Sequence, residues 1–176
     1  MIGEGRLFLL NLTLEKLGLL SEDIVVDIGC GIGYFSIPAA ETVSSINKVY
    51  ALDTSKEMLK EVEKRAAILG IKNLVVIETE EYDLKIQDES VSFALIANVL
   101  HEIINKKRFL KEARRILKPS GRIAIIDWEK KQTEMGPPIG HRIDKQETKE
   151  ILNFSGFEVS MELEISDVFY GLVAVK

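Results

Sequence analysis

Short apolar runs recur along the chain and are separated by longer stretches in which apolar and polar residues alternate with helical spacing. The runs are rich in β-branched residues and have few polar positions, which is typical of strands buried on both faces of a parallel sheet. We therefore predict strands over IVVDIG (24–29), KVYALD (48–53), NLVVIE (73–78), FALIANV (93–99) and RIAIIDW (122–128).

In the intervening segments the apolar residues recur every three or four positions, as on the buried face of a helix. One such pattern ends at Gly70, and glycine commonly terminates helices. Thr54, followed three residues later by Glu57, predicts a capping box for this helix. Asn105 can cap a later helix, which the KPSG turn at 118–121 is expected to end.

The pattern changes after the fifth strand. The segment EKKQTEMGPPIGHR (129–142) is polar and proline-containing, which predicts a loop. A helix is expected in 144–156, followed by two strand-like segments, 157–165 and 168–176, that are close enough to pair antiparallel. The whole pattern predicts a single α/β domain over 1–176. We expect a doubly wound three-layer sandwich around a mostly parallel seven-stranded sheet, with a C-terminal antiparallel hairpin.

Composition narrows the classes of function. A net charge of -5 in 176 residues disfavours a broad nucleic-acid-binding surface. The single cysteine, Cys30, excludes an intramolecular disulfide and a cysteine-rich zinc site, and no basic residue flanks it to activate a thiolate. The chain has no secretory signal and no apolar run long enough for a membrane-spanning helix, so we expect a cytoplasmic protein.

The segment VVDIGCGIGYF (25–35) places three glycines on alternate positions directly after an apolar run. A strand that enters such a turn and continues into a helix can cradle a nucleotide, although a glycine-rich turn alone can mark only a turn. Gly29 would allow the tight turn, Gly31 would let a ligand approach the backbone, and Gly33 would let the helix pack on the strand.

Asp53 ends the second predicted strand, twenty residues after Gly33. In a βαβ unit this position puts a carboxylate at the tip of the neighbouring strand, where it can accept hydrogen bonds from ribose hydroxyls. The alternative is a capping role for the helix that starts near Thr54. The glycine spacing is G-x-G-x-G, not the dinucleotide G-x-G-x-x-G, and Asp27 ahead of the loop suits a cationic group better than a phosphate.

These segments resemble the motifs of the class I, Rossmann-like S-adenosylmethionine-dependent methyltransferases. VVDIGCGIGYF resembles their first motif, and VYALDTS the second. ETEEYDLKIQDESVSFALIANVLHEI is similar to their third and fourth motifs, and EARRILKPSGRIAIIDW to the one around the fifth strand. MGPPIGHR is similar to a loop in small members of the group that includes ubiquinone and menaquinone biosynthesis methyltransferases. The resemblance covers roughly 20–175 and implies S-adenosylmethionine as cofactor, with S-adenosylhomocysteine as product.

The resemblance also implies a role for individual residues. The methionine part of the cofactor is expected to be surrounded by Asp27, Gly29, Gly31 and Gly33. Asp53 is expected to accept hydrogen bonds from both ribose hydroxyls.

The adenine end is expected to lie between Thr54 and Met58, or the neighbours of Met58. Glu80 aligns with the acidic residue that accepts the adenine amino group, and the backbone amide of Glu81 would meet a ring nitrogen. Asn98 would offer its backbone carbonyl or amide near the methionine amino group.

One segment departs from the family pattern. Most members carry an aspartate where SVSFA has Ser92 and Ala94 around Phe93. The resemblance therefore implies no electrostatic contribution from this position, while cofactor binding itself is unaffected.

Two residues are candidates on the acceptor side. His101 follows the fourth strand and can act as a general base, or else start a helix that packs on the edge of the cofactor. Arg142 can bind a carboxylate or phosphate of the substrate in a bidentate manner, or else be a surface charge of the loop. We expect the acceptor pocket to involve the amino-terminal helix around Arg6 and Phe8, the segment after the fourth strand, and the 129–143 loop.

The sequence favours an enzyme that transfers a methyl group to a small molecule. Two alternatives remain open at this point. One is a noncatalytic S-adenosylmethionine-binding partner subunit, and the other is an NAD-dependent reductase. The C-terminal hairpin and the 129–143 loop could meet a second subunit in a homodimer.

Overall fold

The computed structural model describes residues 4–176, with side chains from residue 9 onward. Helices and strands alternate through most of it. The elements are α1 (Glu4–Lys16), β1 (Val25–Ile28), α2 (Ser36–Thr42), β2 (Val49–Asp53), α3 (Lys56–Leu69), β3 (Leu74–Glu78), β4 (Val91–Ala97), α4 (Lys106–Ile116), β5 (Leu117–Trp128), the short 3-10 helix η1 (Ile139–His141), α5 (Lys145–Phe154), β6 (Glu158–Ser166) and β7 (Phe169–Val175).

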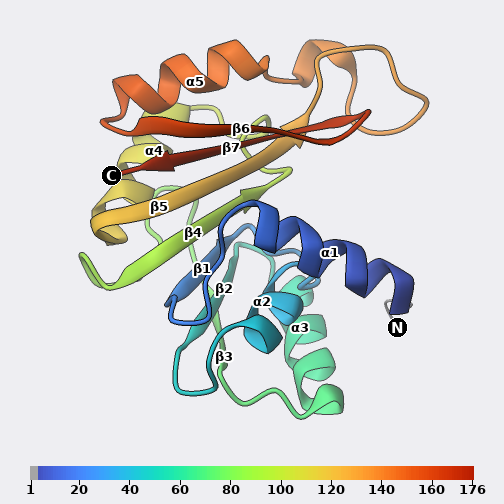
Figure 1. Ribbon diagram of the computed structural model, residues 1–176, viewed down its shortest axis with the longest axis vertical. Coiled ribbons are helices and arrows are strands. Elements are labelled where there is room, and N and C mark those ends of the chain that lie inside the picture. The colour runs from blue at the N-terminus through green and yellow to red at the C-terminus, as the bar shows by residue number, and fades with distance from the viewer. Residues whose placement is uncertain (1–3) are drawn as a thin grey trace.

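The seven strands form one sheet in the order β3-β2-β1-β4-β5-β7-β6. Strands β1 to β5 pair in parallel, while β7 runs antiparallel to both β5 and β6. The helices α1, α2 and α3 cover one face of the sheet, and α4 and α5 cover the other (Figure 1). The predicted doubly wound sandwich with its C-terminal hairpin is confirmed. No helix of the described part is long and apolar enough to cross a membrane.

The central strands β1 and β4 are almost fully buried because helices lie on both of their faces, whereas the edge strand β3 is only partly buried. In β4, Phe93, Leu95 and Ile96 are each at most 1 % exposed. Such strands need apolar side chains on both faces, which is why continuous apolar runs identified them in the sequence. The order of the strands places the tips of β1 and β4 side by side at the centre of the sheet, where the crossover direction reverses and ligands bind in folds of this kind.

Some element ends differ from the sequence predictions. Ser55, not Thr54, caps α3: its hydroxyl accepts a hydrogen bond from Met58 N at 3.4 Å. The helix α4 is capped by Asn105 as expected but ends at Ile116. The KPSG residues belong to β5 but have no partner in β4, because the register shifts between the pairs Val91–Leu117 and Phe93–Arg122.

The family departure at Ser92 lies at the amino-terminal edge of the sheet, opposite to the tips of the strands. Its hydroxyl accepts from Ile24 N at 3.0 Å and donates to Asp23 at 2.7 Å. Asp23 in turn accepts from Arg122 at 2.7 Å. Ser92 therefore joins the beginnings of β1, β4 and β5, and it has a structural function here.

Candidate functional site

The glycine turn after β1 exposes backbone at one point and packs tightly at two others. Gly29, Gly31 and Gly33 have φ of +74°, +52° and +81°. A Cβ on Gly29 would approach Val99 to 2.4 Å, and one on Gly33 would approach Val62 to 3.2 Å. A Cβ on Gly31 would meet nothing within 4 Å. Gly31 therefore faces open space, which fits the close ligand approach that its position in the sequence suggests.

This difference gives a matched pair of variants. Gly31→Ala is expected to leave the fold in place and to weaken cofactor binding, since its methyl group enters the groove. Gly29→Ala is expected to destabilise the protein, because its methyl group would overlap Val99. The positive φ itself costs an alanine about 1–2 kcal/mol in either case. Thermal unfolding and calorimetric titration with S-adenosylhomocysteine distinguish the two variants. Equal stability losses, or normal affinity in Gly31→Ala, would contradict the assignment.

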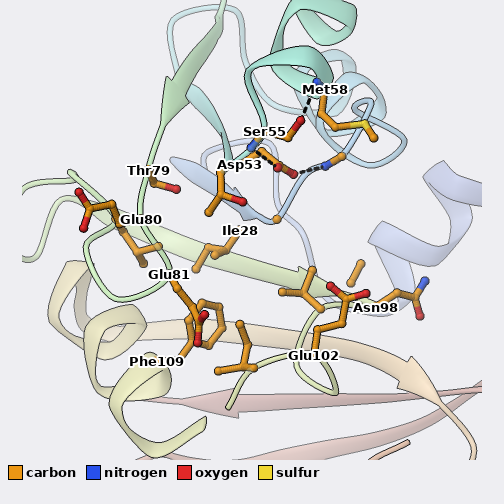
Figure 2. Close-up of a pocket in the computed structure, with 17 residues that line it drawn as sticks. Ile28, Asp53, Ser55, Met58, Thr79, Glu80, Glu81, Asn98, Glu102 and Phe109 are labelled. Atoms are coloured by element: carbon orange, nitrogen blue, oxygen red, sulfur yellow. Dashed lines mark hydrogen bonds between the residues drawn. The ribbon is translucent and has the colours of Figure 1, made fainter. Parts of the chain in front are cut away.

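Asp53 joins the glycine turn to the start of α3. Its Oδ2 accepts a hydrogen bond from Gly31 N at 2.8 Å, and its Oδ1 accepts from Ser55 N at 2.9 Å. A carboxylate has about four lone-pair sites, so these two bonds leave acceptor capacity on both oxygens. Asp53 also lines a cavity of about 540 Å³ between the tips of β1, β2 and β4 (Figure 2). The position suits both readings of the sequence, local capping and ribose binding.

The cofactor candidates gather around two connected cavities. The larger one has Asp53, Thr54, Met58, Glu80 and Glu81 in its wall. A smaller one of about 340 Å³ lies beside Asp27, Cys30 and Tyr34. Gly29, Gly31, Met58, Ala97 and Asn98 line both cavities, which therefore form one groove. Of the predicted cofactor residues, only Gly33 lines neither cavity.

Two buried side-chain oxygens of residues that line this groove have no hydrogen-bond donor in the described part of the chain, Glu81 Oε1 and Asn98 Oδ1, although the Asn98 amide is directed away from the other labelled residues (Figure 2). An unpaired buried acceptor costs stability, so both positions suit N–H or O–H donors of a ligand. Glu80 is exposed, and its side chain points away from Asp53 (Figure 2). The backbone N of Asn98 donates to Ile126 O at 2.8 Å, which leaves its carbonyl, not its amide, for a ligand.

Asp27 gives the smaller cavity a carboxyl group whose charge depends on pH. Its side chain is 2 % exposed and accepts from Ser36 Oγ at 2.5 Å. Burial raises the pKa of Asp27 from its ordinary 3.8 to about 6, and the nearby charge of Asp53 adds to this, while the Ser36 hydrogen bond opposes it. Burial also raises the pKa of the Cys30 thiol, in line with a packed residue and not a nucleophile.

Because the pKa of Asp27 is raised in the folded protein, its contribution to stability is complete below about pH 4 and is lost as the pH rises through 6. Burial favours the protonated form of Asp27, whereas a cationic ligand group favours its ionised carboxylate. We expect the affinity for S-adenosylhomocysteine, which carries an ammonium group, to rise about tenfold from pH 5 to pH 7. Calorimetry across this range tests it. Asp27→Asn should flatten the profile, and an unchanged slope in that variant would contradict the role of Asp27.

His101 lies in a turn after β4, five residues before α4 begins at Lys106, so it does not start a helix. Its side chain is 6 % exposed, and its Nδ1 lies 2.7 Å from Oδ1 of Asp127. Its backbone N donates to the other oxygen of Asp127 at 3.2 Å. Sequence reasoning missed Asp127. The available signal was a single carboxylate at the carboxyl end of the otherwise apolar run of β5.

A third cavity, of about 500 Å³, lies between this turn and the loop 129–143. It adjoins the groove, because Glu102 lines both. Its wall contains His101, Lys106, Lys130 and His141. The loop and the segment after β4 therefore border a cavity as expected. The side chains of Arg6 and Phe8, which we also expected there, lie outside the described residues.

The structure contradicts both roles that the sequence suggested for Arg142, substrate binding and a surface charge of the loop. Arg142 is 4 % exposed and therefore not a surface charge. Its five N–H groups, all that a guanidinium has, donate to Pro137 O, Glu129 O, Lys131 O, Met135 O and Thr133 Oγ1. The guanidinium also lies 5.0 Å from the ring centre of Trp128. No donor is left for a substrate anion, so Arg142 holds the loop in shape.

Comparison with known proteins identifies the class. A family model for a methyltransferase domain matches residues 19–156, so the chain belongs to this family. A crystal structure of a SAM-dependent methyltransferase from Aquifex aeolicus is similar to it with a TM-score of 0.92 and 31% identity, over 99% of this chain and 94% of that one. The chain thus belongs to the family of S-adenosylmethionine-dependent methyltransferases, as the motifs suggested.

Curated relatives match over shorter parts of the chain. The chloroplastic 2-phytyl-1,4-beta-naphthoquinone methyltransferase of Arabidopsis thaliana is 30% identical over 132 residues, which are 73% of this chain and 50% of that protein. The demethylmenaquinone methyltransferase of Oceanobacillus iheyensis is 26% identical over 115 residues, 65% of this chain and 48% of that protein. The chain spans about half the length of these relatives.

Proposed function

We propose that this methyltransferase binds S-adenosylmethionine in the groove across the tips of β1, β2 and β4 and methylates a small molecule. The observation that carries the proposal is Gly31, whose bare backbone faces the groove between the carboxyl groups of Asp27 and Asp53. A sulfonium nucleoside with an ammonium group is cationic, so two flanking carboxyl groups attract it. A phosphate-containing nucleotide would be repelled by the same pair.

Each part of the groove then has a function. Asp27 and the carbonyl of Asn98 hold the methionine end beside Gly29 and Gly31, while Gly33 supports the turn from below. Asp53 binds the ribose hydroxyls with the acceptor capacity that its two backbone bonds leave free. At the adenine end, the ring lies between Thr54 and Met58, and Glu80 and Glu81 meet its polar edge. The buried, unpaired Glu81 Oε1 supports a carboxylate contact there besides its backbone amide.

The acceptor enters the third cavity, whose 500 Å³ suit a small molecule. When bound, S-adenosylmethionine supplies an activated methyl group, and its transfer leaves S-adenosylhomocysteine. The protein therefore contributes mainly alignment of the acceptor and removal of its proton. Two relatives are named for naphthoquinone and demethylmenaquinone, which supports reduced quinones as a class to test first.

In this proposed function, residues 1–176 act as one catalytic domain in the cytoplasm, without a nucleic-acid partner. The hairpin of β6 and β7 is the part that would meet a second copy in a homodimer, which light scattering would detect.

Calorimetry with S-adenosylmethionine, S-adenosylhomocysteine and NADH tests the cofactor. We expect binding of the first two and none of NADH. Release of S-adenosylhomocysteine is then measured with 1,4-naphthoquinol and with simple phenols, amines and carboxylates as acceptors. Binding of NADH in the groove would overturn the cofactor assignment. Cofactor binding with no methyl transfer to any of these acceptors would favour a noncatalytic binding subunit.

A further inference from the structure

Asp127 is a buried carboxylate that cofactor binding does not use. It ends β5 and is 0 % exposed, so its hydrogen bonds must come from the protein. Its Oδ1 lies 2.8 Å from Trp128 N and 2.7 Å from His101 Nδ1, and its Oδ2 lies 3.2 Å from His101 N. Two of its three contacts thus go to a single residue, which fixes both the backbone and the ring of His101.

These contacts bear on which ring nitrogen of His101 carries the proton. Asp127 accepts backbone N–H groups on both oxygens, as a carboxylate does, and we assign Nδ1 of His101 as the donor in the third contact. In the neutral imidazole the other nitrogen, Nε2, then holds a lone pair. The ring cannot turn over without breaking the 2.7 Å bond to Asp127. A base at Nε2 is therefore oriented in advance, as in other carboxylate–histidine pairs.

The Nε2 side of the ring faces polar surroundings. Nε2 lies 3.8 Å from Glu102 Oε1, whose side chain is 72% exposed and borders both the groove and the third cavity. Lys106 and Lys130 line the same cavity. Lys106 Nζ donates to Ile103 O at 2.8 Å and keeps two further N–H groups. A base that shares a cavity with two ammonium groups suits an acceptor that becomes an anion.

We propose that the third cavity binds acceptors with an acidic hydroxyl group, a phenol or an enol, that His101 Nε2 deprotonates them, and that Asp127 is the positioning residue for His101. This inference rests on the proposed function and deepens it. In the step itself the O–H bond of the acceptor breaks and its electron pair stays on the oxygen. The proton moves to Nε2, and Lys106 and Lys130 stabilise the oxyanion. The proton later passes to Glu102 or to solvent.

The ionisable and charged groups around His101 come from several elements. They are Glu102, Lys106, Asp127, Lys130, His141, Arg142, Glu147 and Tyr170. Among them, His101 is the group whose ring is fixed by a buried carboxylate and whose Nε2 is left for proton transfer.

The first measurement is the tautomer of His101 by nitrogen NMR in protein loaded with S-adenosylhomocysteine. The chain has only 2 histidines, so the spectrum of His141→Gln assigns the signals of His101. We expect the Nδ1–H form at pH 8. Asp127→Asn should shift it towards Nε2–H, because an asparagine amide can donate to Nδ1. A wild-type Nε2–H form would overturn the proposal.

The second measurement uses 4-nitrophenol, whose absorbance distinguishes the phenol from the phenolate. We expect binding to the loaded wild type to lower the apparent pKa of the probe by about 1 unit or more. In His101→Gln and Asp127→Asn the decrease should shrink to less than half. The decrease that survives in His101→Gln reports the lysines alone. The exposed Asp167→Asn, in the turn between β6 and β7, is the matched control and should behave as wild type.

Kinetics complete the test. With an acceptor that turns over, kcat should fall about 100-fold in His101→Gln, with little change in KM. Cofactor affinity should be unchanged in both variants, which separates this inference from the proposed function.

If S-adenosylhomocysteine does not bind the wild type, the proposed function fails. If it binds but 4-nitrophenol does not, or is ionised equally in wild type and His101→Gln, only the present inference is overturned. If Asp127→Asn is less stable than the wild type but ionises 4-nitrophenol to the same extent, Asp127 has a structural role only.

Discussion

Asp53→Ala is expected to weaken binding of S-adenosylhomocysteine roughly 30- to 700-fold, which corresponds to a loss of about 2–4 kcal/mol. The ribose hydroxyls lose a charged acceptor that no neighbouring side chain replaces. The variant also loses the two bonds to Gly31 N and Ser55 N, which hold the turn and the start of α3 in position. Calorimetric titration measures the change in affinity.

Two further variants separate charge from contact. Asp53→Asn keeps an acceptor of the same shape without the charge, and we expect an intermediate loss. Asp88→Ala removes an exposed carboxylate that pairs with Arg115, away from the groove, and should bind the cofactor normally. A dissociation constant of Asp53→Ala within threefold of the wild type would remove the ribose assignment.

Arg142→Ala is expected to lower the free energy of unfolding by about 2–4 kcal/mol and the melting temperature by about 5–15 °C. The substitution leaves four loop carbonyls and the Thr133 hydroxyl without their donor and removes the contact with Trp128. Arg142→Lys should recover little of this loss, because a single ammonium group cannot serve five acceptors in one plane. Thermal unfolding measures stability, and hydrogen exchange shows whether 129–143 opens first.

Arg108→Ala is the matched control for this effect. Arg108 is exposed and lies 4.5 Å from the ring centre of Tyr82, a contact that contributes about 0.5–1 kcal/mol. A loss in Arg142→Ala no larger than that in Arg108→Ala would mean that the loop keeps its shape without the guanidinium. We further expect Arg142→Ala to raise KM for the acceptor without changing cofactor affinity, since the loop lines the third cavity and not the groove.

The fold was predictable because its signals are local and repeated. Strands buried on both faces are visible in the sequence as apolar runs. The end of α3 is marked by Gly70, which adopts a φ of +69°. The errors lay at the ends of elements. The KPSG segment (118–121) forms an irregularity in β5 between the paired residues Leu117 and Arg122, with Ser120 at φ of +61°, so its turn-like composition fits its backbone but does not show that β5 already begins at Leu117.

The site was predictable to a different degree on its two sides. The cofactor side follows from short sequence spacings, such as the one between the glycine turn and Asp53. The acceptor side depends on contacts between distant positions. Asp127 is 26 residues from His101, and no sequence pattern joins them. The partners of Arg142 are mostly backbone carbonyls, which every residue carries, so the sequence could not show that its donors were taken.

The backbone carbonyls that surround Arg142 also affect how the sequences of related enzymes can diverge. Four of the five acceptors around Arg142 are indifferent to which side chains the loop carries. We therefore expect the loop to tolerate exchange at many positions along 129–141, provided that Arg142, Trp128, the Thr133 hydroxyl and Gly136, where a Cβ would approach the Trp128 ring to 2.7 Å, are retained. If the third cavity binds the acceptor as proposed, acceptor preference can change through this loop at little cost to the rest of the fold.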